Sequence, residues 1–213
     1  MKRILCYGDS NTHGTKPMRD QNDVARFSET ERWPSVTSAT LGTTGFEIIE
    51  EGLPGRTTVH DDVIEGAHKN GKTYLLPCLE SHWPLDAIVM ALGVNDLKAR
   101  YGVQPSDIAA SVGVLIDVIN TAPCFGGKPP KILVLASPPI IETGWLADMF
   151  SGGAEKSLRL SKALATMAAK RNVAFFDAGT VAKVSPIDGI HFDATNHQAI
   201  GHAVALQLKD ILA

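Results

Sequence analysis

Five short apolar segments recur along the chain, and they constrain the fold more than any other feature. They are rich in Val, Ile and Phe, and they run Arg3–Tyr7, Phe46–Glu50, Ala87–Leu92, Ile132–Ala136 and Val173–Asp177. Each is continuously apolar and does not alternate with polar residues, which is typical of strands buried on both faces of a parallel sheet. We therefore predict a five-stranded parallel sheet from these segments.

Helical patterns fill the gaps between the apolar segments. Ser106–Asn120 places apolar residues at helical spacing, and Ala154–Lys170 and Asn196–Leu212 behave likewise. Strands that alternate with helices form right-handed βαβ units, so helices should cover both faces of the sheet. Two longer connections, residues 11–34 and 137–155, interrupt the pattern. With no internal repeat or linker, residues 1–213 should form one α/β domain, a three-layer α/β/α sandwich.

The composition excludes several classes of protein. The formal net charge is −3 and the basic residues are scattered. The sequence therefore lacks the stripe of basic residues with which a nucleic-acid-binding protein contacts phosphates, and no nucleic-acid partner is expected. The first apolar run is too short for a signal peptide or a membrane span, and we expect a cytoplasmic protein without a membrane partner. Cys6, Cys78 and Cys124 are odd in number and widely spaced, which predicts buried free thiols and neither disulfides nor metal ligands.

The residues suited to chemistry follow the predicted strands. Ligands of an open parallel sheet bind outside the carboxyl ends of its strands. Ser10 follows the first strand, a turn containing Gly55 the second, Asn95 the third, and the pair Asp188 and His191 lies beyond the fifth. A hydroxyl, backbone N–H donors, a carboxamide and a carboxylate–imidazole pair are the groups that an acyl-transfer site needs.

Each of these residues also has a purely structural interpretation. Ser10 stands where a helix cap is common, Gly55 fits an ordinary turn, and Asn95 fits a capping turn. A lone Asp–His pair such as Asp188 and His191 is often a surface contact. Their convergence at one edge of the predicted sheet is what favours catalysis over these alternatives.

Four sequence blocks resemble those of the SGNH (GDSL-type) hydrolases, in the family's order and over nearly the whole chain. They are Gly8-Asp9-Ser10, Gly55 in a Gly-x-x-Gly-Arg-Thr-Thr turn, Gly93-x-Asn95-Asp96 and Asp188-x-x-His191. Glu50-Glu51-Gly52-Leu53 and Phe175-Phe176-Asp177-Ala178-Gly179 further resemble the bacterial arylesterase/acyltransferase branch. The resemblance implies a flavodoxin-like fold with no metal and no organic cofactor.

The resemblance assigns a role to each block. Ser10 is the expected nucleophile, His191 its general base, and Asp188 the carboxylate that orients the imidazole. The oxyanion would be bound by the Ser10 and Gly55 backbone N–H groups and the Asn95 side-chain amide. We thus expect hydrolysis of a small-molecule ester, carrying a short acyl group on an aryl or alkyl alcohol, through an acyl-enzyme, with some acyl transfer to alcohols.

Six residues are expected to shape the substrate pocket: Asn11, Lys16, Ile140, Trp145, Met149 and Phe150. Lys16 stands near a position where acyltransferase-like relatives carry an aromatic residue, which favours plain hydrolysis. The apolar loop 140–150 needs a cover, and a pocket wall or a subunit contact would provide one. The resembling branch forms large homo-oligomers, so a homo-oligomer is expected, with the octamer as one candidate.

Two other functions remain open at this stage. The same triad would serve a carbohydrate O-acetyl esterase, and the fold alone would serve a non-catalytic flavodoxin-like binding module. No zinc-type spacing is present around His191 and His197. The other histidines are expected at the surface or as caps without a specific partner; they are His13, His60, His68, His82 and His202.

Overall fold

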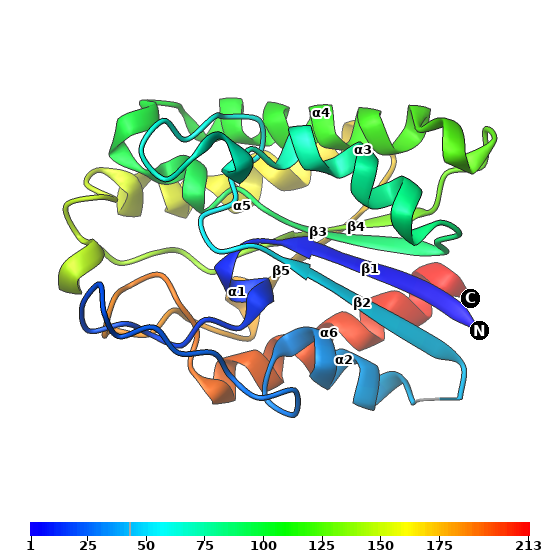
Figure 1. Cartoon of the computed structure of the whole chain (residues 1–213), viewed down its shortest axis with the longest axis horizontal. Helices are drawn as coiled ribbons and strands as arrows, with labels where there is room; N and C mark the ends of the chain where they lie inside the picture. The colour runs from blue at the N-terminus through cyan, green and yellow to red at the C-terminus, as the bar shows by residue number, and fades with distance from the viewer. Residues whose placement is uncertain (43) are drawn as a thin grey trace.

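The five apolar segments form one parallel sheet, as their continuous burial predicts. In the computed structural model, which describes residues 1–42 and 44–213, the strand order is β2-β1-β3-β4-β5 (Figure 1). The strands are β1 (Lys2–Gly8), β2 (Phe46–Gly52), β3 (Ala87–Ala91), β4 (Lys131–Ala136) and β5 (Ala174–Asp177). In the register of β1, Ile4 lies beside Ile48 of β2 and Ala87 of β3.

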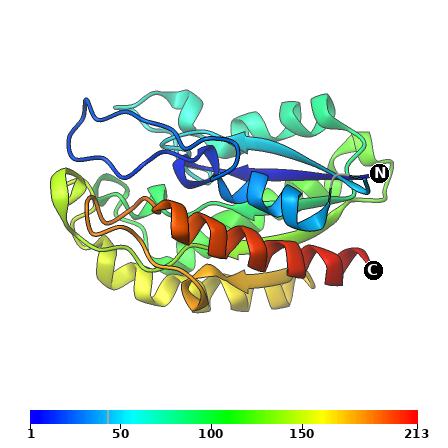
Figure 2. The ribbon, with the colours of Figure 1, turned by 90° about the horizontal axis from the view of Figure 1, so that it is seen from below.

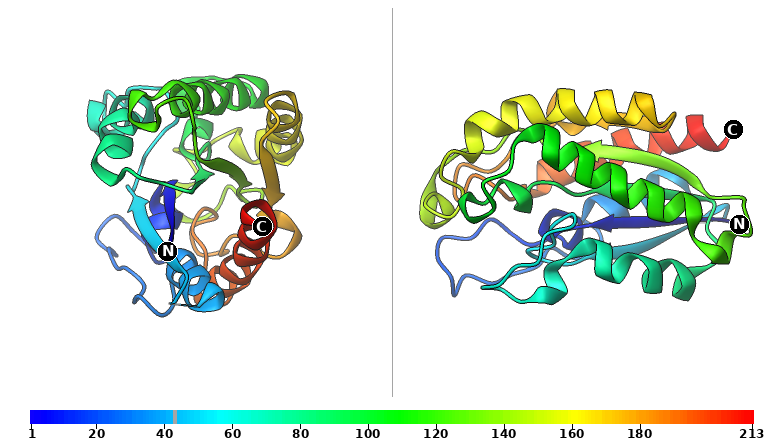
Figure 3. Two further views of the ribbon diagram at one scale, coloured as in Figure 1. Left: turned by 90° about the vertical axis from the view of Figure 1, so that its right-hand side faces the viewer. Right: turned by 90° about the horizontal axis from the view of Figure 1, so that it is seen from above.

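Helices cover both faces of the sheet, which confirms the predicted α/β sandwich. Helices α3 (Gly71–His82), α4 (Pro105–Thr121) and α5 (Gly153–Lys170) cover one face. Helices α2 (Trp33–Leu41) and α6 (Ala194–Leu212) lie side by side on the other, as seen from below in Figure 2. Figure 3 shows the two helical layers on either side of the strands.

Each face of the sheet has its own apolar core. Along β1, Leu5 and Tyr7 point into the core under α3, α4 and α5. Ile4 and Cys6 point the other way, into the core formed with α2 and α6. All four side chains are fully buried, which explains why this strand is apolar at every position and not at every second one.

Helices α2 and α3 were not recognised in the sequence. Helix α3 starts at Gly71 and contains Pro77, two residues that weaken a helical pattern because glycine is flexible and proline lacks the N–H donor. The Asn70 side chain caps the helix by accepting hydrogen bonds from the backbone N–H groups of Lys72 and Thr73. Burial of Leu75 on the sheet then stabilises the helix despite its proline.

The remaining segments are turns and loops. Short 3₁₀ helices cover Ala67–Lys69, Asn95–Leu97, Ala99–Tyr101, Pro123–Phe125, Gly144–Leu146 and Ala178–Thr180. Among the described residues, no helix combines the length and the apolar character that crossing a bilayer requires. Cys6 and Cys78 are buried as predicted, but Cys124 is only half-buried because it lies in the surface turn after α4.

Candidate active site

Ser10 lies at the carboxyl end of β1, where the chain turns into the four-residue helix α1 (Ser10–His13). Asp9 precedes it as the cap of this helix, and its Oδ1 accepts a hydrogen bond of 2.9 Å from the Asn11 N–H. The cap fixes the turn and places Ser10 as the first helical residue. Asp9 thus braces the turn that carries Ser10, and burial raises its pKa to about 6.

The structure brings Ser10, His191 and Asp188 into one hydrogen-bonded chain. The Ser10 Oγ lies 3.0 Å from His191 Nε2, and His191 Nδ1 lies 2.6 Å from Asp188 Oδ2. Because a carboxylate only accepts hydrogen bonds, Nδ1 carries the ring proton. Nε2 is therefore free to accept the Ser10 proton, which is the tautomer that a general base needs.

Asp188 is fully buried and is held by several donors. Its carboxylate accepts the N–H groups of Ile190 and His191, each at 3.0 Å, and that of Met18 at 2.8 Å, besides the imidazole. Burial on its own would raise the pKa of Asp188, but the hydrogen bonds from His191 and from these backbone groups outweigh it and lower the pKa. The carboxylate is therefore ionised at neutral pH.

Gly55 and Asn95 reach the same site from two other strand ends. Gly55 has a φ of 80°, and a Cβ at this position would lie 2.6 Å from Glu65 Oε2, so the turn requires glycine. The Asn95 side chain donates a hydrogen bond of 3.2 Å to the Arg56 carbonyl. This bond connects the turn after β2 with the turn after β3, directly beside Ser10.

Asp96 and His60 form a second pair behind these turns. The buried Asp96 carboxylate accepts hydrogen bonds from the Thr58 N–H, the Thr58 hydroxyl and His60 Nδ1, the last at 2.8 Å. The hydrogen bond to Asp96 raises the pKa of His60. The prediction of a partnerless His60 is therefore wrong, since its partner lies in a block 36 residues away.

Arg56 is a further residue that sequence reasoning missed. Its guanidinium is buried and lies over the Tyr7 ring, 4.2 Å from the centroid. Its Nη1 donates to the Gly8 carbonyl at 2.9 Å and to the Glu51 carbonyl at 2.5 Å. Arg56 therefore ties the ends of β1 and β2 together, and this fixes Gly55 relative to Ser10. The only indication of this role in the sequence was the position of Arg56 directly after Gly55 of the motif.

Ser10 and His191 open into a pocket of about 330 Å³. Trp145, Met149 and Phe150 line it, as the sequence predicted. Polar and charged residues also line it, and none of these was predicted. This second set comprises Thr15, Gln21, Glu65, Lys69 and Lys98.

The other three predicted pocket residues do not line this pocket. Asn11 faces the interior, where its Nδ2 donates to the Ile190 carbonyl at 3.1 Å and braces the loop that carries His191. The Lys16 ammonium turns away to lie 5.0 Å from the centroid of the Phe27 ring. Ile140 belongs to the apolar core beneath the loop. Lys16, which was expected to shape the pocket, therefore does not line it.

A Ser–His–Asp chain at the carboxyl edge of a parallel sheet is the arrangement of an α/β serine hydrolase. Residues 6–199 match the sequence profile of the GDSL-like lipase/acylhydrolase family. The chain belongs to this family, as the resemblance of its four blocks predicts.

Solved structures give a closer comparison. The chain is similar to an aryl esterase from M. smegmatis, with 40% identity, a TM-score of 0.94 and coverage of 100% of both chains. It is also similar to Est24, a carbohydrate acetylesterase from Sinorhizobium meliloti, with 38% identity, a TM-score of 0.91 and coverage of 99% of both chains. No significant match was found among curated protein sequences. The family and these neighbours identify a carboxylic ester hydrolase, not a binding module without activity.

Proposed function

We propose that the protein is a serine esterase that hydrolyses short-acyl aryl or alkyl carboxylic esters through an acyl-enzyme on Ser10. One observation carries the proposal. The Ser10 hydroxyl, the His191 imidazole and the ionised Asp188 carboxylate form a continuous hydrogen-bonded chain, with contacts of 3.0 Å and 2.6 Å. We further propose that residues 1–213 act as one hydrolase domain, because four strand ends contribute to the site.

Acylation starts when the Ser10 oxygen attacks the ester carbonyl. His191 Nε2 takes the hydroxyl proton as the new C–O bond forms, and Asp188 stabilises the resulting imidazolium. The tetrahedral oxyanion is bound by the Ser10 and Gly55 N–H groups and the Asn95 amide. On collapse, the C–O bond to the leaving alcohol breaks, and His191 returns the proton to that alcohol.

Deacylation repeats these steps with water. His191 removes a proton from the water molecule as it attacks the Ser10 ester, and the carboxylic acid leaves as the Ser10 hydroxyl re-forms. An alcohol in place of water gives acyl transfer. Because Glu65, Lys69 and Lys98 are among the pocket-lining residues, we expect the site to accept water in preference to an apolar alcohol, and hydrolysis to dominate over acyl transfer.

A labelling experiment tests the nucleophile. A fluorophosphonate probe should modify Ser10 alone, as located by peptide mass spectrometry, and Ser10→Ala should abolish both labelling and hydrolysis of an aryl acetate. Ser106→Ala is the matched control, since this exposed serine lies at the start of α4. Labelling elsewhere, or full activity of a folded Ser10→Ala protein, contradicts the proposal.

The pocket supports a small substrate. A volume of about 330 Å³ lies at the lower end of the range of about 300–1,000 Å³ for small-molecule pockets. We therefore expect kcat/KM to fall as the acyl chain of an aryl ester is lengthened from acetate to octanoate. A rise with chain length would contradict a short-acyl preference.

A carbohydrate O-acetyl esterase is the second candidate, and the charged residues of the pocket favour it. Lys98 Nζ lies 2.5 Å from Glu65 Oε1, and Lys69 donates to the Pro54 carbonyl at 2.8 Å. Such groups suit the hydroxyls of a sugar better than an aryl ring. If the protein is a carbohydrate O-acetyl esterase, Glu65→Gln should lower kcat/KM for an acetylated sugar more than for an aryl acetate. Equal effects on both would favour the aryl ester.

We also propose that the chain forms a homo-oligomer. Ile141, Trp145 and Ile187 are apolar and between 37% and 47% exposed. They lie in two segments that pack together, since the Ile141 N–H donates to the Gly189 carbonyl at 2.9 Å. A second copy would cover this group. Sedimentation at micromolar concentration checks this, and a monomer would contradict it.

A further inference from the structure

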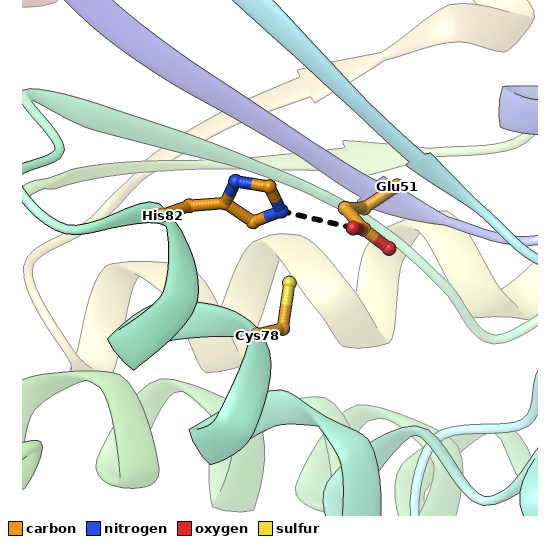
Figure 4. Close-up of side chains that lie close together, drawn as sticks. All are labelled: Glu51, Cys78 and His82. Atoms are coloured by element: carbon orange, nitrogen blue, oxygen red, sulfur yellow. Dashed lines mark hydrogen bonds and ion pairs between the residues drawn. The ribbon is translucent and has the colours of Figure 1, made fainter.

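Three metal-binding side chains converge between α3 and the edge strand β2, away from the pocket that contains Ser10. Cys78 and His82 lie one helical turn apart on the same side of α3. Glu51 comes from the carboxyl end of β2. Figure 4 shows the imidazole of His82 directed toward the Glu51 carboxylate, and the sulfur of Cys78 pointing into the space between these two residues. The Cys, His and Glu ligand atoms all lie within 4.8 Å of one another.

Both oxygens of the Glu51 carboxylate have polar neighbours. His82 Nε2 lies 3.0 Å from Glu51 Oε1 and donates to it, and the Tyr74 hydroxyl lies 3.4 Å from the same oxygen. The other oxygen, Oε2, is turned toward Arg56, whose Nη2 is 4.0 Å away. The guanidinium thus lies on the Oε2 side of Glu51, and the imidazole lies on the Oε1 side.

The Cys78 thiol has no role in ester hydrolysis. It is fully buried, and burial together with the Glu51 charge raises its pKa to about 12. A protonated, enclosed thiol of this kind is a poor nucleophile. A divalent metal ion bound to the sulfur would instead stabilise the thiolate, because coordination deprotonates the thiol.

We propose that Glu51, Cys78 and His82 form a Zn²⁺ site. One thiolate, one imidazole and one carboxylate are the ligand types that zinc takes, and a soft thiolate disfavours Mg²⁺ and Ca²⁺. The Glu51 and His82 side chains are 21% and 28% exposed, so a water molecule can complete a tetrahedral site. The sequence spacing did not suggest this group, apart from the Cys-x-x-x-His pair on one helix.

The protons and charges of the proposed binding step balance. Zn²⁺ replaces the proton of the Cys78 thiol, which is released to solvent, and the ring proton of His82 moves from Nε2 to Nδ1. The Cys78 thiolate and the Glu51 carboxylate supply two negative charges to the ion, and Glu51 shares its charge with the Arg56 guanidinium 4.0 Å away. Metal–ligand bonds of about 2.0–2.3 Å place neighbouring ligand atoms roughly 3.3–3.6 Å apart, so the three ligand atoms, now within 4.8 Å of one another, would move closer together on binding.

The ion would fasten helix α3 to the edge of the sheet. Glu51 belongs to β2, whereas both other ligands belong to α3. Occupancy therefore stabilises the folded chain, because the unfolded chain does not hold the three ligands together. At a free Zn²⁺ concentration about a hundred times the dissociation constant, the melting temperature should rise by roughly 5–10 °C.

Cobalt spectroscopy tests the site directly. Co²⁺ added to protein stripped with a chelator should give a near-ultraviolet thiolate-to-metal charge-transfer band that saturates at one ion per chain, and Zn²⁺ should abolish it. Cys78→Ser should lose the band and weaken Zn²⁺ binding by more than about 100-fold. Cys124→Ser changes the half-buried thiol outside the group, so this variant should keep the Co²⁺ band and the wild-type affinity for Zn²⁺.

A second variant guards against a folding defect in Cys78→Ser. His82→Gln changes a partly exposed side chain and should keep the circular dichroism spectrum, yet lose the Zn²⁺-dependent rise in melting temperature. The proposal is overturned if Co²⁺ gives no thiolate band, if the band survives in Cys78→Ser, or if the folded His82→Gln protein binds Zn²⁺ as tightly as the wild type.

Discussion

Replacing Asp188 with Asn exchanges one carboxylate oxygen, which accepts hydrogen bonds, for an NH₂ group, which donates them. The carboxylate Oδ1 accepts the Ile190 and His191 N–H groups, while Oδ2 accepts the Met18 N–H and His191 Nδ1. An asparagine keeps the two bonds to Oδ1 only if its NH₂ group takes the place of Oδ2. The NH₂ group then faces two donors and can pair with the imidazole only if Nδ1 becomes the acceptor.

This change shifts the ring proton of His191 to Nε2, the atom that must receive the Ser10 proton. A base in the wrong tautomer costs about 10⁴ in turnover in serine proteases, which corresponds to roughly 5 kcal/mol of barrier. The Met18 N–H, which lies 2.8 Å from Oδ2, also loses its acceptor. Loss of a hydrogen bond to a charged group should lower the free energy of unfolding by about 1.5–3 kcal/mol.

The assay measures kcat and KM for an aryl acetate at neutral pH, alongside urea unfolding of the same preparations. Asp193→Asn is the matched control. This exposed aspartate lies five residues from Asp188 in the sequence and caps α6 by accepting a hydrogen bond from the Asn196 N–H. If folded Asp188→Asn lost less than about tenfold in kcat, orientation of the imidazole by Asp188 would be refuted.

Other perturbations test the surroundings of Ser10. Asn95→Ala should lower kcat by about 10²–10³ with little change in KM, and an unchanged kcat removes it from the oxyanion hole. Gly55→Ala should lose activity and at least about 1 kcal/mol of stability, measured by urea unfolding, because of the positive φ of 80°. The raised pKa of Asp9, about 6, means that the folded state binds its proton more tightly than the unfolded state. The stability of wild type relative to Asp9→Asn should therefore rise by about 2 kcal/mol as pH falls from 7 to 4; a flat difference contradicts the burial argument. The pKa of His60 is raised by Asp96, so His60→Gln should cost more stability below pH 6 than at pH 9, as followed by thermal melts.

The sheet was predictable from the sequence because strands buried on both faces leave a continuous apolar pattern. The bounds of β1 and β2 differ from the prediction by one or two residues at an end. Helix α3 could not be found in this way, since Pro77 and Gly71 argue locally against a helix and only packing on the sheet decides the outcome.

The catalytic geometry was predictable for a different reason. Parallel strands gather their carboxyl ends at one edge, so Ser10 and Asn95, which closely follow β1 and β3, were expected to lie near each other. His191 lies farther from a strand end, and its place was expected from the resemblance of the Asp188-x-x-His191 block. Pocket residues followed no such rule, because the direction of a loop side chain depends on tertiary contacts. Lys16 turned toward Phe27, and Ile140 turned into the core. The partner of His60 was hidden because sequence gives no register between two loops.

The hydrogen bond between the Met18 N–H and Asp188 connects the triad to the long loop after α1. That loop also supplies Thr15 and Gln21 to the pocket wall. Lifting the loop to admit a larger ester therefore removes a donor from a buried charge, at a cost of about 1.5–3 kcal/mol, so open conformers should make up only about 1–10% of the population. The size of the substrate and the orientation of His191 are therefore coupled. An ester large enough to force the loop open removes the Met18 N–H from Asp188, and Asp188 then orients the His191 imidazole less firmly.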